Sequence, residues 1–185
     1  MSPEPSSPIR FKATLLRPAM PKNATWRFLR LPKSASARLP SRGMVSVEGM
    51  FAGQPFKATL EPDGEGSHWL KVPRALHEAA GIEASDTVAL EIAPAAKEPE
   101  PRLPPDLRKA LAGAPAALAQ WKTITAAARR DFIQWLSTAK QVDTRARRIR
   151  NACDMLAAGK RRICCFDRSG IYSRGNIGAP EAARD

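Results

Sequence analysis

Residues 129–160, RRDFIQWLSTAKQVDTRARRIRNACDMLAAGK, decide the fold of the C-terminal half of the chain. Their apolar residues recur at spacings of three and four, which places them on one face of a helix. The first such set is Ala128, Phe132, Trp135, Leu136 and Ala139, and the second is Ala146, Ile149, Cys153 and Leu156. Two such faces joined by a short turn predict an antiparallel helix pair. We expect Thr125 to cap the first helix, Asp143 or Thr144 to cap the second, and Gly159 to end it.

Arginine is unusually frequent in this stretch. With the apolar faces inward, Arg147 and Arg148 fall on or near the solvated side, whereas Arg145 leans toward the apolar seam. A guanidinium there needs helix-end carbonyls or a carboxylate, which Asp131 or Asp143 could provide. Arg129 and Arg130 lie near the start of their helix, where cations oppose the helix dipole and call for a partner or a bound anion. The candidate anion- or nucleic-acid-binding residues are therefore Arg129, Arg130, Arg145, Arg147 and Arg148, with an internal ion pair as the alternative for Arg145.

The formal charge of +12 is unevenly distributed along the chain. Residues 1–99 hold 13 Lys/Arg against 10 Asp/Glu, whereas residues 100–185 hold 17 against 8. A surplus of positive charge attracts polyanions, so the basic C-terminal half indicates a nucleic acid, an anionic lipid or an acidic protein as partner. The plain alternative is that the charge serves solubility.

Prolines divide the chain. Five of the twelve residues from Pro94 to Pro105 are proline, which interrupts both helices and strand ladders. We therefore predict a domain at 9–94, a Pro-rich linker at 95–104, a helical module at 105–160 and a tail at 161–185. The last residues of the tail are expected to be disordered.

The N-terminal half alternates short β-rich segments with turn signals. The predicted strands cover residues 9–16, 25–31, 43–51, 54–61, 68–72 and 87–92. Pro73 fits the first turn of a helix over 74–80, which Gly81 can end. The expected fold class is α+β: a small closed six-stranded β-barrel with one short helix, followed by an α-helical C-terminal module.

Aromatic residues of the barrel are candidates for a ligand pocket. Trp26, Phe56 and Trp69 could line the mouth of the barrel, although aromatic residues at strand positions more often belong to the core. The segment from Leu70 to Ile92 also resembles the half-barrel of AbrB and MazE-type DNA-binding proteins. The sixty preceding residues supply enough strands to complete a barrel within one chain, so we interpret this likeness as a shared structural solution.

Cysteine, histidine and motif content narrow the chemistry. The three cysteines have no paired spacing, and His68 and His77 lie far upstream, so we predict neither disulfides nor a metal site, and no cofactor. Cys164 or Cys165 could be a reactive thiol beside arginines, or an apolar plug. No phosphate-binding loop, nucleophile elbow or HExxH pattern is present, so no catalytic residue is proposed. The chain shows neither a secretory signal nor a transmembrane segment, and we expect a cytoplasmic protein.

A family resemblance emerges from the spacing of several residue types. Residues 128–130 (Ala-Arg-Arg), Trp135 with 139–140 (Ala-Lys), residues 144–149 (Thr-Arg-Ala-Arg-Arg-Ile) and 159–160 (Gly-Lys) resemble the YdeI/OmpD-associated, or bacteriocin-protection, family. The barrel ahead of it is similar to the domain of unknown function often fused to that module. The resemblance implies a link to antimicrobial-peptide tolerance or envelope stress, and no catalytic residue.

Three function hypotheses follow. The first is a non-enzymatic binding or stress-tolerance protein in the cytoplasm. The second is a nucleic-acid-binding protein that uses the basic C-terminal helices. The third is small-ligand binding or catalysis in the barrel mouth.

Overall fold

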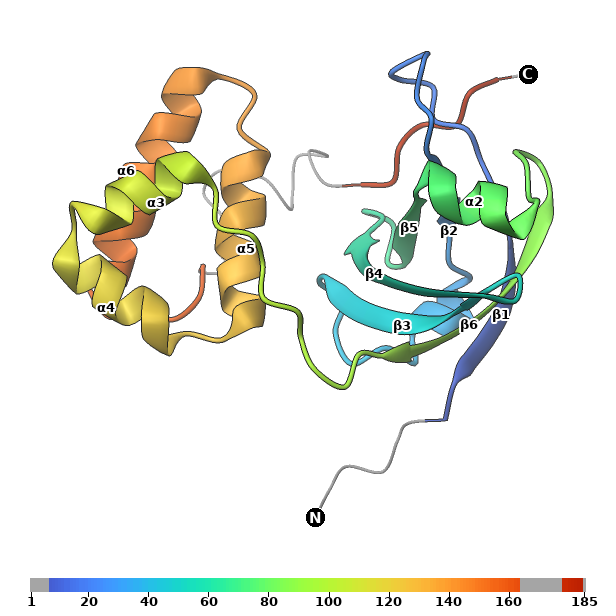
Figure 1. The fold of residues 1–185 in the computed structure, drawn as a ribbon, viewed down its shortest axis with the longest axis horizontal. Coiled ribbons are helices and arrows are strands. Elements are labelled where there is room, and N and C mark those ends of the chain that lie inside the picture. Colours follow the sequence, from blue (N-terminus) through green and yellow to red (C-terminus); the bar gives the residue numbers. More distant parts are fainter. Residues whose placement is uncertain (1–6, 164–177, 185) are drawn as a thin grey trace. The chain divides into compact units, whose positions relative to one another are not determined.

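The computed structural model describes residues 7–163 and 178–184, which divide into two compact units. The barrel unit runs to Ala96 and includes residues 178–184, and the helical unit begins at Lys97. Each unit has its own apolar core (Figure 1). The helical unit is therefore preceded and followed in sequence by parts of the barrel unit.

The barrel unit contains all six predicted strands. They are β1 (Ile9–Thr14), β2 (Arg27–Arg30), β3 (Val45–Phe51), β4 (Gln54–Pro62), β5 (His68–Val72) and β6 (Thr87–Pro94). The sheet is antiparallel in the order β1-β6-β3-β4-β5-β2. An isolated bridge between Leu16 and Phe28 brings its two edges together, so the barrel is nearly closed. The fold class is α+β, as predicted.

Alternation along the strands builds the inner core of the barrel. Val47, Leu60, Leu70, Val88 and Ile92 all belong to this core and are almost fully buried. The tight turn between β3 and β4 falls at Ala52 and Gly53, whose φ angles are 46° and 84°. Both residues lie in the left-handed region that a two-residue hairpin turn of this kind requires.

The barrel unit has two short helices where the sequence predicted one. Helix α2 (Arg74–Ala80) is the predicted helix, and Gly81 ends it at φ 65°. Helix α1 (Lys33–Ser36) is an additional helix of four residues, which packs beside β1. A single turn is too short to show a helical periodicity, which explains why the pattern missed it.

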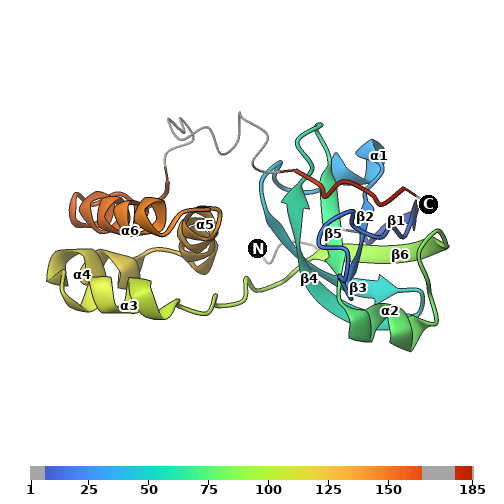
Figure 2. The same cartoon turned by 90° about the horizontal axis from the view of Figure 1, so that it is seen from above.

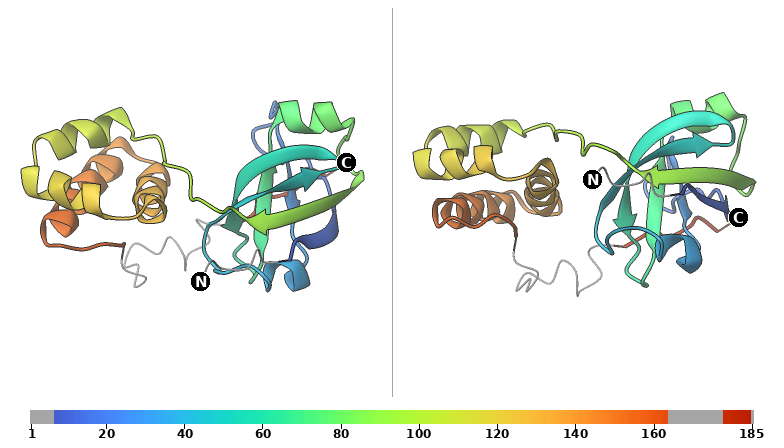
Figure 3. Two further views of the ribbon diagram at one scale, coloured as in Figure 1. Left: turned by 60° about the horizontal axis from the view of Figure 1, so that its bottom comes forward. Right: turned by 90° about the horizontal axis from the view of Figure 1, so that it is seen from below.

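The helical unit contains four helices within the described residues. They are α3 (Pro105–Ala112), α4 (Pro115–Thr123), α5 (Ala126–Ser137) and α6 (Val142–Ala157). In Figures 2 and 3, α3 and α4 form one layer, α6 lies against it and α5 closes one side. Helices α5 and α6 run in opposite directions (Figure 1), although α6 packs most extensively against α4.

The buried faces of the two long helices differ slightly from the predicted ones. On α5, Ala128, Phe132 and Leu136 are buried. On α6, Ile149 and Leu156 are buried with Ala152, whereas Ala146 is exposed. Thr125 caps α5 by accepting a hydrogen bond from the backbone of Ala128, as predicted. Helix α6 instead starts after Gln141 with no side-chain cap, so the predicted caps Asp143 and Thr144 are wrong.

The last described residues of the chain pack against the barrel. Residues 178–184 form backbone hydrogen bonds with residues 17–19 and with Asp63, so the prediction of a disordered end is wrong for these seven residues. Cys164 and Cys165, the candidate reactive thiols, lie outside the described residues.

Candidate functional site

Arg129 binds the end of the preceding helix. Its Nε donates to the carbonyl oxygen of Trp121 (3.0 Å) and its Nη2 donates to that of Lys122 (3.1 Å). Its Nη1 donates to Glu100 Oε1 at 2.7 Å. Because the last carbonyls of α4 have no partner within that helix, the guanidinium acts as its C-terminal cap. Arg129 thus has the kind of partner that was expected for a cation near the start of a helix.

Arg145 joins three helices. Its Nε and Nη2 donate to the two carboxylate oxygens of Asp106, at 2.6 and 3.0 Å, and its Nη1 donates to the carbonyl oxygen of Leu136 at 3.1 Å. The carboxylate belongs to the first turn of α3 and the carbonyl to the last turn of α5. A carboxylate and a helix-end carbonyl were predicted as alternatives, and Arg145 uses both. Asp131 and Asp143, the carboxylates named from sequence, are not those that Arg145 uses.

Arg148 caps α5 beside Arg145. Its Nη1 donates to the carbonyl oxygen of Trp135 (2.6 Å) and to the hydroxyl of Thr138 (2.9 Å). The guanidinium carbon also lies 5.3 Å from the centre of a Trp135 ring, a distance at which a cation is attracted by the ring face. The position of Trp135 is therefore tied to the turn between α5 and α6.

Arg130 lies between two carboxylates. It donates to Glu98, which precedes α3, and to Asp131 Oδ1 at 3.4 Å. Burial raises the pKa of the Asp131 carboxyl group, although the charge of Arg130 opposes the rise. In the other pair, the hydrogen bonds from Arg145 hold the pKa of Asp106 below its ordinary value. The pKa values of Asp131 and Asp106 are thus shifted in opposite directions within one unit.

Four of the five candidate arginines are thus engaged in contacts within the helical unit. Arg147 is the exception, because it is exposed on α6 and forms no hydrogen bond or ion pair with the described residues. Arg150, one turn further along, is exposed in the same way. Anion binding by the five candidates stays a prediction, and the geometry places Arg147 in the best position for it.

Internal pairing changes the charge that the helical unit presents. Residues 97–163 contain 15 Lys/Arg and 6 Asp/Glu. The ion pairs of Arg129, Arg130 and Arg145 engage Glu98, Glu100, Asp106 and Asp131. Removing these three cations from 15 and these four acids from 6 leaves 12 Lys/Arg and 2 Asp/Glu outside those pairs. The exposed charge is therefore almost entirely positive.

The candidate pocket aromatics occupy three different places in the barrel unit. Phe56 is buried in the inner core with its ring edge toward Phe51. Trp69 packs edge-on against Phe28, and neither belongs to the inner core. Trp26 is half-buried, with the ammonium of Lys71 4.7 Å from a ring centre. The structure does not bring Trp26, Phe56 and Trp69 together around one cavity among the described residues, and their role in ligand binding stays a prediction.

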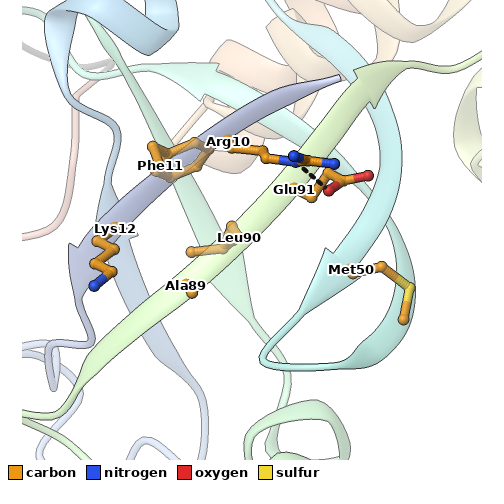
Figure 4. Close-up of a pocket in the computed structure, with 7 residues that line it drawn as sticks. All are labelled: Arg10, Phe11, Lys12, Met50, Ala89, Leu90 and Glu91. Carbon is orange, nitrogen blue, oxygen red and sulfur yellow. Dashed lines mark hydrogen bonds and ion pairs between the residues drawn. The ribbon is translucent and has the colours of Figure 1, made fainter. Parts of the chain in front are cut away.

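An open hollow of about 430 Å³ lies on strands β1, β3 and β6 (Figure 4). It is lined by Arg10, Phe11, Lys12, Met50, Ala89, Leu90 and Glu91. Arg10 Nε and Glu91 Oε2 lie 2.7 Å apart across it. These residues were not predicted from sequence, because Met50, an exposed residue paired with Glu91 of β6, gives little signal in a strand pattern.

The described residues offer few further reactive groups. They contain no group of three or more His, Cys, Asp or Glu side chains that could hold a metal ion. Burial raises the pKa of the Cys153 thiol, which disfavours the reactive thiolate. Buried His68 accepts from the Ser36 hydroxyl at Nδ1 (2.7 Å) and donates from Nε2 to the carbonyl oxygen of Gly43 (2.8 Å). Both its nitrogens are thereby used in holding α1 and the chain before β3.

Two family models match the chain. Residues 11–92 match the domain of unknown function DUF1905, and residues 100–159 match the family described as bacteriocin-protection, YdeI or OmpD-associated. Both resemblances are confirmed. The DUF1905 match covers the barrel strands, and the YdeI/OmpD-associated match covers all four helices of the helical unit. A comparison with curated proteins found no match.

The YdeI/OmpD-associated region supplies all five candidate arginines, and the DUF1905 region supplies the three candidate aromatics. In the part of the chain that the structure describes, each helix is too short or too polar to cross a bilayer.

Proposed function

We propose that the protein is a non-enzymatic binding protein whose helical unit holds an acidic protein partner. The observation that carries this proposal is the surplus of 12 Lys/Arg over 2 Asp/Glu outside the ion pairs of Arg129, Arg130 and Arg145. A surface of one sign speeds encounter with partners of the opposite sign and rejects like-charged ones.

The internal contacts favour a protein partner over nucleic acid. The nucleic-acid hypothesis relied on Arg129, Arg130, Arg147 and Arg148 for phosphate contacts. Three of these guanidinium groups already donate to carbonyl or carboxylate oxygens of the same unit. Breaking such contacts to bind phosphates would cost stability. Of the four arginines, only Arg147 can bind a phosphate group without losing a contact to the described residues.

The family description links this region with protection against bacteriocins. We propose that any such role runs through an anionic partner, because a surface with this charge repels cationic peptides. A stress-tolerance role in the cytoplasm is part of the same proposal.

Binding of labelled polyglutamate, single-stranded DNA and duplex DNA by fluorescence anisotropy tests the proposal. We expect polyglutamate to bind at low salt and to dissociate as the salt concentration rises. The double variant Arg147→Gln/Arg150→Gln should weaken binding about three- to tenfold, since exposed charges contribute modestly. The matched control Lys33→Gln/Arg42→Gln removes two exposed cations from the barrel unit and should leave the affinity unchanged.

Two outcomes would overturn this function. Absence of polyglutamate binding at low salt would remove the acidic partner. Tighter binding of DNA than of polyglutamate, lost in Arg147→Gln/Arg150→Gln, would replace it with the nucleic-acid hypothesis.

A further inference from the structure

The last described residues of the chain lie along the barrel unit in an extended conformation. We call residues 178–184 (Gly-Ala-Pro-Glu-Ala-Ala-Arg) the tail segment. Its backbone hydrogen bonds with the barrel run from Ala179 N–H to Asp63 O (3.3 Å), from Ala19 N–H to Glu181 O (2.7 Å) and from Ala183 N–H to Arg17 O (2.8 Å). The tail segment is therefore held through its backbone, as an added strand would be.

The tail segment crosses the outer side of strands β5 and β2. Asp63 follows β4, whereas Arg17 and Ala19 follow the bridge that joins β1 to β2, so these contacts lie on opposite sides of β5 and β2. Figure 2 shows the segment passing beside β5 and β2 toward the end of β1. The outer face of these two strands is thus the surface over which it lies.

Two large aromatic side chains are buried on this outer face. Leu70 and Val72 of β5 point into the inner core, so Trp69 between Leu70 and His68 points outward, and so does its neighbour Phe28 of β2. Phe28 is nevertheless fully buried and Trp69 is only 8% exposed. An outward aromatic pair in a small barrel needs a cover from outside, and the tail segment lies where that cover is needed.

The tail segment leaves one buried hydrogen-bond donor of this outer face without an acceptor. The indole nitrogen of Trp69 is buried and has no hydrogen-bond partner among the described residues. Buried indole N–H groups usually find an acceptor. A buried donor left unfilled on the outer face of β5 is what a surface shaped for an occupant with its own side-chain acceptor would show.

The chemistry of the fitting occupant can be read from the tail segment. The backbone bonds demand an extended chain, and five of the seven side chains are glycine, alanine or proline. Gly178 approaches closely, since a Cβ there would lie 3.3 Å from the carbonyl oxygen of Asp63. Small side chains therefore let the backbone reach its partners.

We propose that the outer face of β5 and β2 is a peptide-binding site, filled here by the chain's own tail segment. Its partner in trans is an extended peptide of small residues and proline with a side-chain acceptor for Trp69. The tail segment competes with that peptide at an effective concentration on the order of millimolar, as for other tethered ligands. A peptide from another protein binds when its concentration and affinity are high enough to displace the tail segment.

A labelled peptide of residues 178–184 provides the probe. Ala179→Pro/Ala183→Pro removes two donors of the tail segment in the full chain, because proline has no backbone N–H. We expect fluorescence polarisation to show at least tenfold tighter binding of the probe to this variant than to the unaltered chain. The control Ala182→Pro lies at the bridge with Pro18 and leaves all three hydrogen bonds in place, so it should behave like the unaltered chain.

Amide hydrogen exchange checks docking independently of the probe. In Ala179→Pro/Ala183→Pro, exchange at Ala19, which donates to Glu181, should accelerate at least tenfold. Exchange at Leu16, which donates to Phe28 within the barrel, should stay unchanged and shows that the barrel remains folded. Equal probe binding by the folded variant and the unaltered chain, or unchanged exchange at Ala19, would overturn the proposal.

Discussion

The barrel unit and the helical unit satisfy their buried polar groups by different means. In the barrel unit, buried polar side chains bond to nearby hydroxyl and backbone groups, as in the contacts of His68 with Ser36 and Gly43 and of the Asp63 carboxylate with the backbone N–H of Ser67. In the helical unit, Arg129 and Arg145 crosslink helix ends through carboxylates and free carbonyls. The barrel backbone is paired by neighbouring strands, whereas each of the four short helices leaves unpaired carbonyls at its C-terminal end. Arg129 and Arg145 therefore serve first to hold the helices of this unit together.

The largest change in stability is expected where the backbones of β3 and β6 approach each other in the barrel unit. A Cβ at Gly49 of β3 would lie 1.9 Å from the carbonyl oxygen of Glu91 on β6. We expect Gly49→Ala to destabilise the barrel unit by about 3 kcal/mol, because two paired strands must move apart. Urea unfolding followed by barrel amide signals measures the loss. Gly43→Ala, whose nearest atom would be Ser41 Oγ at 3.4 Å, should change stability by less than about 0.5 kcal/mol.

The second effect concerns the arginine crosslinks. Arg145→Met keeps most of the apolar stem of the side chain but leaves Asp106 and the Leu136 carbonyl without this donor. We expect a loss of about 1–2 kcal/mol confined to the helical unit, measured by the same unfolding experiment on helical amides. Equal destabilisation of both units would contradict the separation drawn between them.

The strands and helices followed from sequence more fully than the contacts did. Alternation gave all six strands, and Pro73 with Gly81 framed α2. That Arg145 would need a carboxylate or helix-end carbonyls was also predicted, but Asp106 lies 39 residues away in the first turn of α3, where no sequence pattern singles it out. The spacing of apolar residues predicts which face of a helix is buried, but it does not predict which other helix packs against that face. The tail segment was missed for a related reason, since bonds made by the backbone leave no pattern in side chains.

Acid should act in opposite directions on Glu61 of the barrel unit and on Asp106 of the helical unit. Burial raises the pKa of Glu61 in the barrel, so its protonated form is favoured in the folded state, and the barrel unit should gain stability as pH falls toward the ordinary glutamate range. The pKa of Asp106 is lowered by Arg145, so its contribution is present above the ordinary aspartate pKa and is lost as pH falls through the lowered value.

Unfolding midpoints measured between pH 7 and pH 2 separate these two responses. Glu61→Gln should remove the gain of the barrel unit, and Asp106→Asn should flatten the loss of the helical unit in acid. A gain of the barrel unit that persists in Glu61→Gln would assign it to another group.

The smallest effect is expected at Arg147. Because its side chain is exposed and has no partner among the described residues, Arg147→Gln should change the stability of the helical unit by less than about 0.5 kcal/mol. Thermal unfolding of this variant beside Arg145→Met measures the difference. A loss as large as that of Arg145→Met would mean that Arg147 also holds the helices together.

The return of residues 178–184 to the barrel affects how the protein should respond to a protease. Both ends of the helical unit lead back to the barrel, one through the proline-rich linker and the other toward the docked tail. A single nick in the linker would therefore leave two fragments that copurify for as long as the tail holds. The rate at which the two fragments separate after cleavage measures how tightly the tail segment binds the barrel unit.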